Sequence, residues 1–263
     1  KDLPGGTASD VTYQYDNGLG DGDTANSWGR LRRAYVGASA TANAHQYKYD
    51  SRGRTAWEQV TLDLANYATS YTYDSADRVK TTTYPDGIET VTNSYLPNGQ
   101  VHSVSSSLGN VYVGSISYTP WGAPDVMKLG PSGAPVVQVD HSYYPWAGSG
   151  GEGRARLAQI VAGVPTDLDS LQDLDYLYDF SGNVARITDT EPTSTQVQEF
   201  GYDDLGRLTS AQATGGAYGN YGPEVYGYSA IGNLTSKAGV GYTYGTSQPH
   251  AVRRVSGSGG ASK

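Results

Sequence analysis

Short stretches in which two tyrosines flank one other residue set the pattern of polar and apolar positions in this chain. Tyr71-Thr72-Tyr73 and Tyr226-Gly227-Tyr228 are clear examples, and Phe200-Gly201-Tyr202 has phenylalanine in the first place. Because side chains two residues apart in a strand point to the same face, the two rings of a pair share one surface. The alternation predicts short β-strands, and stacked copies predict rows of aromatic rings whose cross-strand pairs fix the register of a sheet.

A turn is predicted directly after each tyrosine pair. In the copy that ends at Tyr49, the sequence continues with Asp50, Gly53 and Arg54. An Asp at the first position of a turn accepts a hydrogen bond from a backbone N–H two residues on, and a Gly three residues later supplies the positive φ that closes the loop. One repeat is therefore predicted to be a β-hairpin, with Asp50 and Arg54 meeting across its turn. Asp77 replaces this Gly in the next copy, and Asp tolerates a left-handed conformation better than most residues.

The pattern recurs along the whole chain. The second tyrosine of successive copies is Tyr15, Tyr49, Tyr73, Tyr95, Tyr118, Tyr144, Tyr178, Tyr202, Tyr228 and Tyr244. Most steps are therefore 22 to 26 residues, inside the range of about 20–50 residues that is typical of stacked repeat architectures. Two steps of 34 residues indicate loop insertions, and a final step of 16 residues suggests that the pattern stops partway.

These residues resemble the YD repeat of the RHS family, whose consensus is close to Y-x-Y-D-x-x-G-R-L-T. The family includes the C component of bacterial Tc toxins, polymorphic RHS toxins and the extracellular teneurins. The similarity covers nearly the whole chain, and the segment from Tyr202 to Thr209 matches the consensus at each defined position. The repeat-defining positions are Tyr47, Tyr49, Asp50, Gly53, Arg54, Tyr71, Tyr73, Asp74, Arg78, Tyr176, Tyr178, Asp179, Gly182, Tyr202, Asp203, Gly206, Arg207, Tyr226, Tyr228 and Gly232.

The resemblance implies an all-β fold in which consecutive antiparallel hairpins form a spiralling, hollow β-shell. A β-solenoid is the alternative fold. In the toxin members the shell encloses a C-terminal polypeptide, and in teneurins it supports extracellular adhesion. We expect residues 1–255 to form one YD-repeat array, part of a larger shell, and residues 256–263 to form a flexible Gly/Ser tail. The toxin members end the shell with a core region whose aspartates carry out self-cleavage, and no such region follows His250.

Composition favours a thin sheet over a thick apolar core. Hydrophobic residues make up 37% of the 263 residues, and 23 of them are tyrosines, whose hydroxyl groups need water or a hydrogen-bond partner. The 35 glycines and 12 prolines agree with many short strands joined by turns. Helix is expected to be scarce. Its best candidate is Asp167–Leu177, where leucines recur at three-residue steps, although the aspartates between them fit a loop equally well.

Charge and residue types exclude several functions. The net charge of −8 argues against nucleic acid as a partner, because phosphate contacts require basic side chains. The chain has no cysteine for disulfides or thiolate metal sites. The sequence contains no apolar run of about 18 residues, so no membrane span is predicted in this segment. The first residues lack a basic and apolar leader, so they are interpreted as mature sequence of a fragment.

Four aromatic residues are candidates for carbohydrate binding. Trp121, Trp146, Tyr143 and Tyr144 lie in degenerate copies of the repeat, where loops could display their rings to a sugar. Packing against neighbouring strands is the commoner role of aromatic residues in a sheet. The segment from Asp16 to Asp23 has the oxygen-rich character of a calcium loop, but its spacing fits no EF-hand and a solvated loop is the favoured interpretation.

No catalytic residue, metal site or cofactor is predicted. The four histidines are scattered without metal-ligand spacing. No Gly-x-Ser-x-Gly sequence lies between a strand and a helix, as a nucleophile elbow requires. Nothing selects one carboxylate pair for glycoside hydrolysis among the 26 acidic residues, so a glycosidase is the least favoured hypothesis.

The predicted function is that of a non-catalytic structural shell segment in a secreted or bacterial cell-surface RHS/YD-repeat protein. Such a segment encloses a passenger polypeptide or forms an extracellular scaffold. The alternative is a carbohydrate-binding adhesive module. The expected partners are the rest of a larger chain of its own, a C-terminal toxin passenger and, under the alternative, glycans.

Overall fold

The computed structural model describes residues 11–16, 26–37, 43–147, 153–191 and 194–257, and these residues form β-strands and turns. The strands are β1 (Val11–Tyr15), β2 (Leu31–Val36), β3 (Asn43–Tyr49), β4 (Thr55–Leu62), β5 (Ala65–Tyr73), β6 (Val79–Thr83), β7 (Thr90–Tyr95), β8 (Val101–Ser106), β9 (Val111–Tyr118), β10 (Pro124–Leu129), β11 (Val137–Tyr143), β12 (Leu157–Val164), β13 (Asp167–Tyr178), β14 (Val184–Glu191), β15 (Ser194–Tyr202), β16 (Leu208–Thr214), β17 (Tyr221–Tyr228), β18 (Leu234–Lys237), β19 (Val240–Tyr244) and β20 (Val252–Gly257).

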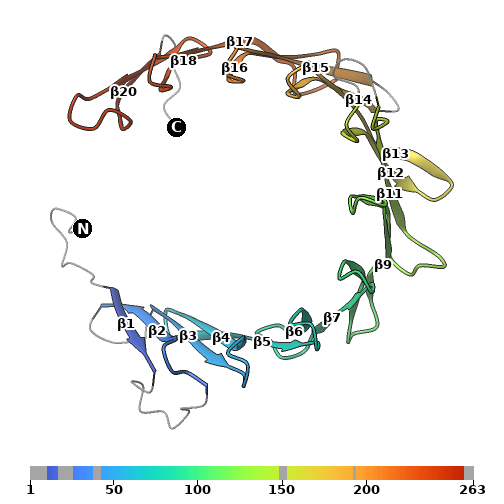
Figure 1. Ribbon diagram of the computed structural model, residues 1–263, viewed down its shortest axis with the longest axis vertical. Coiled ribbons are helices and arrows are strands. Elements are labelled where there is room, and N and C mark those ends of the chain that lie inside the picture. Colours follow the sequence, from blue (N-terminus) through green and yellow to red (C-terminus); the bar gives the residue numbers. More distant parts are fainter. Residues whose placement is uncertain (1–10, 17–25, 38–42, 148–152, 192–193, 258–263) are drawn as a thin grey trace. The chain divides into compact units, whose positions relative to one another are not determined.

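The chain divides into two units, and Figure 1 shows the strands of each following one another in chain order. Unit 1 consists of residues 1–116 and 130–133, and unit 2 consists of residues 117–129 and 134–263. In unit 1 each strand from β1 to β9 pairs antiparallel with its neighbours in the sequence. The strands from β10 to β20 in unit 2 follow the same rule. The predicted array of consecutive antiparallel hairpins is therefore confirmed. A β-solenoid would instead pair strands that lie one coil apart in the sequence.

Both interpretations of Asp167–Leu177, a helix or a loop, are wrong, because this segment forms strand β13 between β12 and β14. Leu171, the middle leucine of the supposed helical stripe, is exposed. Hydrogen-bonded ladders on both sides override the local leucine spacing. Among the described residues no helix is long and apolar enough to span a membrane.

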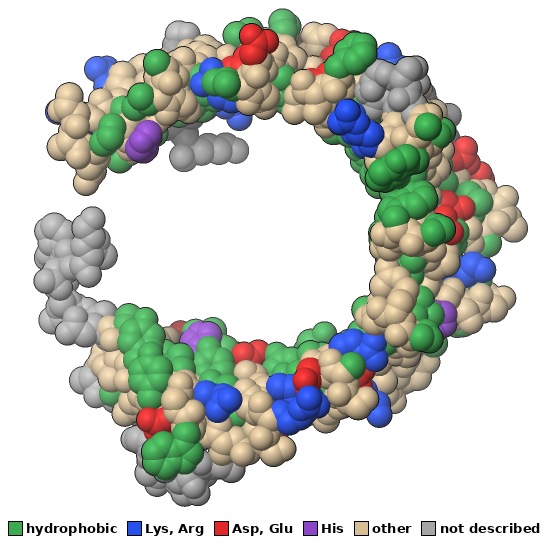
Figure 2. All heavy atoms as spheres, in the orientation of Figure 1, with side chains coloured by type: hydrophobic (Ala, Val, Ile, Leu, Met, Phe, Trp, Pro, Cys, Tyr) green, Lys and Arg blue, Asp and Glu red, His purple; other side chains and the backbone are tan. Residues whose placement is uncertain are grey.

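Each unit is a single layer of strands, and it has almost no apolar core. Among the described residues, the buried hydrophobic side chains are those of Ala44, Ala211 and Ala213. The strands in extensive contact are neighbours in the sequence. Figure 2 shows hydrophobic side chains at the surface of both units, interspersed with charged ones. The thin sheet predicted from the low aliphatic content is therefore found, and its strands are held together by backbone ladders along their length.

The predicted tail at residues 256–263 lies mostly outside the described residues. Ser256 and Gly257 complete strand β20, where they pair with Gly241 and Val240.

Candidate functional site

In the clearest copies of the repeat, the turn of the hairpin is closed by an aspartate and the residue four positions later. Gly53 N donates to Asp50 O over 2.9 Å, and Asp50 N donates to Arg54 O over the same distance. One carboxylate oxygen of Asp50 accepts the backbone N–H groups of Arg52 and Arg54, at 2.9 and 3.0 Å. Gly53 has a φ of +80°, which a side chain would disfavour. The turn chemistry predicted from the sequence is confirmed here.

The other carboxylate oxygen of Asp50 binds the Arg54 side chain, with Nε at 2.7 Å and Nη2 at 2.6 Å. This hydrogen bond to Arg54 is the main reason why the pKa of Asp50 lies below its ordinary value. The predicted Asp–Arg pair across the turn is therefore present. The same arrangement holds in the Asp74–Arg78 and Asp203–Arg207 turns.

Two turns use an asparagine in place of the arginine. Asn183 Nδ2 donates to the Asp179 carboxylate over 2.8 Å, so the turn keeps its closing hydrogen bonds without an ion pair. In the turn that contains Gly232, Asn233 N donates to the Ser229 hydroxyl over 3.1 Å. Gly182, Gly206 and Gly232 all have positive φ values.

The second tyrosine of most repeats connects its hairpin to the preceding one. The Tyr73 hydroxyl donates to the backbone carbonyl of Thr55 over 2.6 Å, and Thr55 directly follows Arg54. This hydrogen bond satisfies a carbonyl at the start of the preceding return strand. Equivalent bonds run from Tyr49 to Leu31, Tyr95 to Val79, Tyr178 to Leu157, Tyr202 to Val184, Tyr228 to Leu208 and Tyr244 to Leu234. In the degenerate copy at Tyr143-Tyr144, the bond to the preceding return strand comes from Tyr143, to Pro124, and not from Tyr144 as the sequence pattern predicts.

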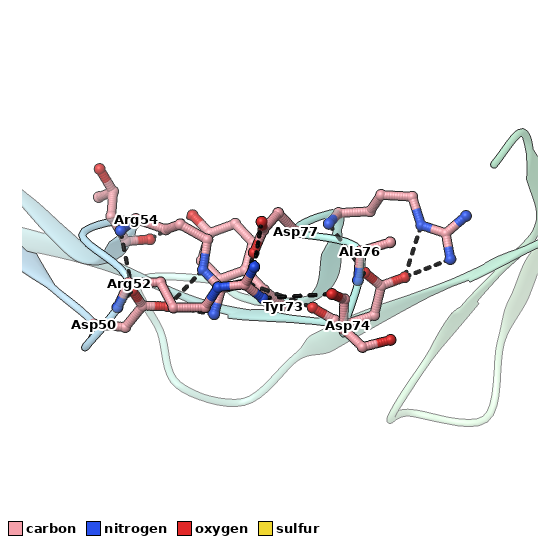
Figure 3. Close-up of polar contacts among 10 residues, drawn as sticks. Asp50, Arg52, Arg54, Tyr73, Asp74, Ala76 and Asp77 are labelled. Carbon is pink, nitrogen blue, oxygen red and sulfur yellow. Dashed lines mark hydrogen bonds and ion pairs between the residues drawn. The ribbon is translucent and has the colours of Figure 1, made fainter.

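The turn arginine lies over the ring of that same tyrosine in the next hairpin (Figure 3). Arg54 Cζ is 4.3 Å from the centroid of the Tyr73 ring. Burial is the largest of the causes that raise the pKa of Tyr73, so the hydroxyl keeps its proton for the bond to Thr55. Similar stacks, at 4.3 to 5.6 Å, join Arg30 to Tyr49, Arg78 to Tyr95, Arg156 to Tyr178 and Arg207 to Tyr228. We call the combination of hydroxyl bond and stacked guanidinium the hairpin joint.

The hairpin joint differs from the predicted rows of aromatic rings. Ring pairs are found at Trp121–Tyr143 and at Tyr144–Tyr178, with centroids 5.7 and 6.3 Å apart. At Tyr73 the ring faces a guanidinium instead. A planar guanidinium can stack on an aromatic face while its N–H groups bind a carboxylate in the plane. Arginine therefore meets the tyrosine above it and the aspartate beside it at the same time.

The left-handed position of the turn also touches the preceding hairpin. A Cβ atom added at Gly53 would overlap the guanidinium of Arg30, and one at Gly182 would overlap that of Arg156. The positive φ favours glycine at these positions, and any other residue would also have to displace the guanidinium that lies beside it.

Asp77 occupies this position with a φ of +64°, as predicted. Its carboxylate extends to the preceding turn, where it forms ion pairs with Arg54 and, at 2.8 Å, with Arg52 (Figure 3). Where other copies have a glycine, Asp77 thus forms an ionic bridge to the preceding turn. The sequence pattern did not predict this bridge.

The four candidate sugar-binding residues lie in unit 2. Trp121 and Trp146 are 54% and 76% exposed. The hydroxyl groups of Tyr143 and Tyr144 donate to the carbonyls of Pro124 and Tyr176, at 2.6 and 2.7 Å. Both tyrosines therefore already have a structural role in joining strands, and a sugar-binding role for the four residues stays a prediction.

Metal ligands do not gather in the part of the chain that the structure describes, where no group of three or more suitable side chains is found. Residues 17–25, which contain most of the candidate calcium loop, lie outside the described residues. Asp16 itself accepts a hydrogen bond from Gly29 N, so it closes a turn like the other aspartates of the repeat.

An array of antiparallel hairpins, linked turn to strand by arginine and tyrosine, defines a class of repetitive β-sheet proteins. Neither a family model nor a curated protein matches the chain. Solved structures of Tc toxin shells match it over nearly its whole length. The Tc holotoxin pore of Photorhabdus luminescens is 16% identical, with a TM-score of 0.57 over 97% of this chain and 16% of that one. A crystal structure of TcdB2-TccC3-TEV is 18% identical, with a TM-score of 0.59 over 96% of this chain and 16% of that one.

A crystal structure of TcdB2-TccC3 is 17% identical and has a TM-score of 0.53 over 93% of this chain. The chain thus has the fold of an RHS/YD-repeat shell, as its sequence resemblance predicted. It spans about one-sixth of the length of the chains that it matches.

Proposed function

We propose that this chain is a non-catalytic wall segment of a larger RHS/YD-repeat shell, which encloses a passenger polypeptide or serves as an extracellular scaffold. The observation that carries this proposal is the hairpin joint. It recurs along the array, and the polar groups of its side chains bind one another or the backbone of the neighbouring hairpin. In Arg54 and Tyr73 the polar groups of the repeat are occupied in holding the sheet together, which supports a structural role.

The single layer of strands supports the same role. A wall that surrounds a volume needs area rather than thickness, and the described residues bury very few apolar side chains. The perturbed pKa values of Asp50, Asp74 and Asp203 arise in turn ion pairs and not in a cleft where acidic groups converge. No site for chemistry is therefore proposed in the described part of the chain.

Further repeats of the same kind are the proposed partners of the two outermost strands. Among the described pairings, β1 pairs with β2 and β20 pairs with β19. Val252 and Val255 on β20 are exposed, and an open strand edge is a template for another strand. A continuing array in a longer chain would cover both edges. The related shells are parts of chains about six times as long as this one.

A C-terminal toxin passenger is the proposed content of the shell, and a secreted or bacterial cell-surface location is the proposed setting. Nucleic acid is not a proposed partner, because the net charge of −8 would repel it. These proposals derive from the likeness to Tc toxin shells, one of which is described as a holotoxin pore.

Protease protection tests the enclosing role. A longer natural chain that contains this segment and the sequence downstream is expressed, and the digestion of its C-terminal part is followed over time. Enclosure predicts that the C-terminal part is resistant in the native protein and is digested rapidly once the shell has been unfolded by denaturant. Rapid digestion in a natively folded chain would rule out enclosure and leave the scaffold role.

Carbohydrate binding is a second candidate, favoured by the exposure of Trp121 and Trp146. Exposed aromatic rings offer a flat apolar face with little need for rearrangement. A glycan array with the wild-type chain and with Trp121→Ala and Trp146→Ala variants tests it. Binding that is lost in either variant supports the adhesive role, whereas absence of binding, or binding that both variants retain, removes it.

A further inference from the structure

A small polar hollow lies beside the β14–β15 hairpin in unit 2, away from the hairpin joints. Its volume is about 240 Å³, and it is lined by Asp189, Ser194, Gln196 and the loop residues 216–219. Asp189 and Gln196 are directly opposite each other in the antiparallel pair, so their side chains share one face of the sheet. The loop between β16 and β17 forms the other wall.

This loop is held in place by specific contacts with β15. The Gln196 amide donates to the carbonyl of Tyr218 over 2.8 Å, and the Asn220 amide donates to the carbonyl of Gly216 over 2.7 Å. Gly215 has a φ of +91°, and a Cβ atom there would overlap the carbonyl oxygen of Thr195. The loop conformation is therefore fixed by hydrogen bonds and by close backbone packing, so the loop would lose little conformational entropy when a ligand binds.

Two side chains at the hollow are not used by the fold. The Tyr218 side chain is on the braced loop with 89% of its surface exposed, although its carbonyl is bound. The Asp189 carboxylate has no hydrogen-bond or ion-pair partner among the residues that the structure describes, although its backbone pairs within the sheet. Tyr218, whose ring is exposed, and Asp189, whose carboxylate is unpaired, thus line the same small volume.

The lining selects one class of ligand. A carboxylate without a Lys or Arg among the lining residues disfavours anions. A lining of Asp, Ser, Gln and Gly residues offers little to a purely apolar ligand. A pyranose has hydroxyl groups that donate to a carboxylate and accept from an amide or hydroxyl group, and it has a C–H face that packs on an aromatic ring. A single pyranose ring is small enough for a hollow of about 240 Å³.

We propose that Asp189, Gln196, Ser194 and Tyr218 form a binding site for a single pyranose unit of a glycan. Asp189 accepts hydrogen bonds from two sugar hydroxyl groups, the Ser194 hydroxyl provides a third polar contact, and the Tyr218 ring stacks on the sugar. Gln196 positions the loop. The site goes beyond the shell function and shares no residue with the Trp121 and Trp146 candidates, so each of these hypotheses can fail separately.

Saturation-transfer NMR with a panel of methyl pyranosides tests the site on the whole chain. The panel contains glucose, galactose, mannose and N-acetylglucosamine derivatives, each at millimolar concentration. At least one sugar is expected to receive saturation from the wild-type protein and to shift the backbone amide signals of Gly216 and Gly219. Tyr218→Ala and Asp189→Asn are each expected to weaken binding of that sugar about tenfold or more.

Phe180→Ala is the matched control, because Phe180 is 84% exposed on a different hairpin turn of the same unit. It should bind the sugar as the wild type does. Thermal melts establish that each variant is folded. The proposal is overturned if no sugar in the panel binds, if Tyr218→Ala and Asp189→Asn both retain binding, or if the amide shifts fall elsewhere in the chain.

Discussion

Arg54 closes the turn of its own hairpin and also covers the ring of Tyr73 in the next one, with 4.3 Å between Cζ and the ring centroid. The Tyr73 hydroxyl in turn binds the carbonyl of Thr55, the residue after Arg54. Two side chains thus make reciprocal contacts between hairpins. Because the sheet has almost no apolar core, we expect its stability to depend on these joints.

Removal of one hydroxyl group should measure the contribution of a joint. In Tyr73→Phe the Thr55 carbonyl loses its side-chain donor, and we expect the free energy of unfolding to fall by about 0.5–1.5 kcal/mol. Urea denaturation followed by circular dichroism gives this difference. Tyr67→Phe, an exposed position on the same strand, is the control and should change stability little. Equal stabilities for the two variants would contradict a role for the hydroxyl bond.

We expect that lysine cannot take over the role of the turn arginine. Lysine keeps the charge but lacks the planar group that stacks on Tyr73 while it binds Asp50. We expect Arg54→Lys to lower the melting temperature by about 2–4 °C. Arg253→Lys, on the exposed strand β20, is the control. If both variants melt together with the wild type, charge alone explains the role of Arg54.

Asp77 gives a test in which two effects have opposite signs. Asp77→Gly relieves the left-handed backbone but loses the ion pairs with Arg52 and Arg54, whereas Asp77→Ala loses the ion pairs and keeps the backbone strain. We expect Asp77→Ala to be the less stable variant at every salt concentration. Because salt screens exposed ion pairs, the deficit of Asp77→Gly relative to wild type should shrink as salt is added. Denaturation at low and high ionic strength checks both statements, and a salt-independent deficit would contradict the ionic bridge.

Acid should weaken the turns. The side-chain bond from Arg78 is the largest of the causes that place the pKa of Asp74 below its ordinary 3.8. A lowered pKa in the folded state stabilises the protein above pH 3.8, and this contribution is lost as the pH falls through 3.8 toward the lowered value. Asp74→Asn should therefore be less stable than wild type at neutral pH, with a difference that narrows in acid. The exposed Asp204→Asn should show no such narrowing.

Alkali should act through Tyr71. Burial, followed by the hydrogen bond to Glu58, raises the pKa of Tyr71 from 10.0 to about 12. A raised pKa contributes stability that is complete below pH 10.0 and is lost as the pH rises toward 12. Tyrosinate absorbance, compared between wild type and Tyr71→Phe, isolates this late titration. Glu58→Gln should lower the pKa of Tyr71 but leave it above 10.0, since burial is the larger cause. A return to 10.0 would contradict that order.

Local chemistry could be predicted from the sequence, because the groups involved are neighbours in it. Asp50 and Arg54 are four residues apart, and the turn between them needs only a Gly at its third step. Neither the helix nor the loop that the segment Asp167–Leu177 suggests by itself is found, because its pairing partners lie on β12 and β14. The secondary structure of such a segment is decided by its pairing with other strands, and a local sequence pattern carries no information about that pairing.

The hairpin joint could not be derived in the same way, since it needs the register of two hairpins. A signal was nevertheless present. Each stacking arginine precedes its tyrosine by 17 to 22 residues, as in Arg54 and Tyr73 or Arg78 and Tyr95. No comparable signal in the sequence predicts the hollow beside Tyr218, because Asp189, Gln196 and Tyr218 are not among the repeat-defining positions.

The acceptor of each tyrosine hydroxyl is a backbone carbonyl, which every residue possesses. Thr55, Val79 and Leu208 serve equally well in that place. The hydroxyl bond therefore does not depend on which side chain starts the preceding return strand, and only the stacked arginine has to be kept. Duplication or loss of one whole unit in the gene recreates a complete interface at the new boundary, so arrays of this kind can change in length during evolution without compensating substitutions.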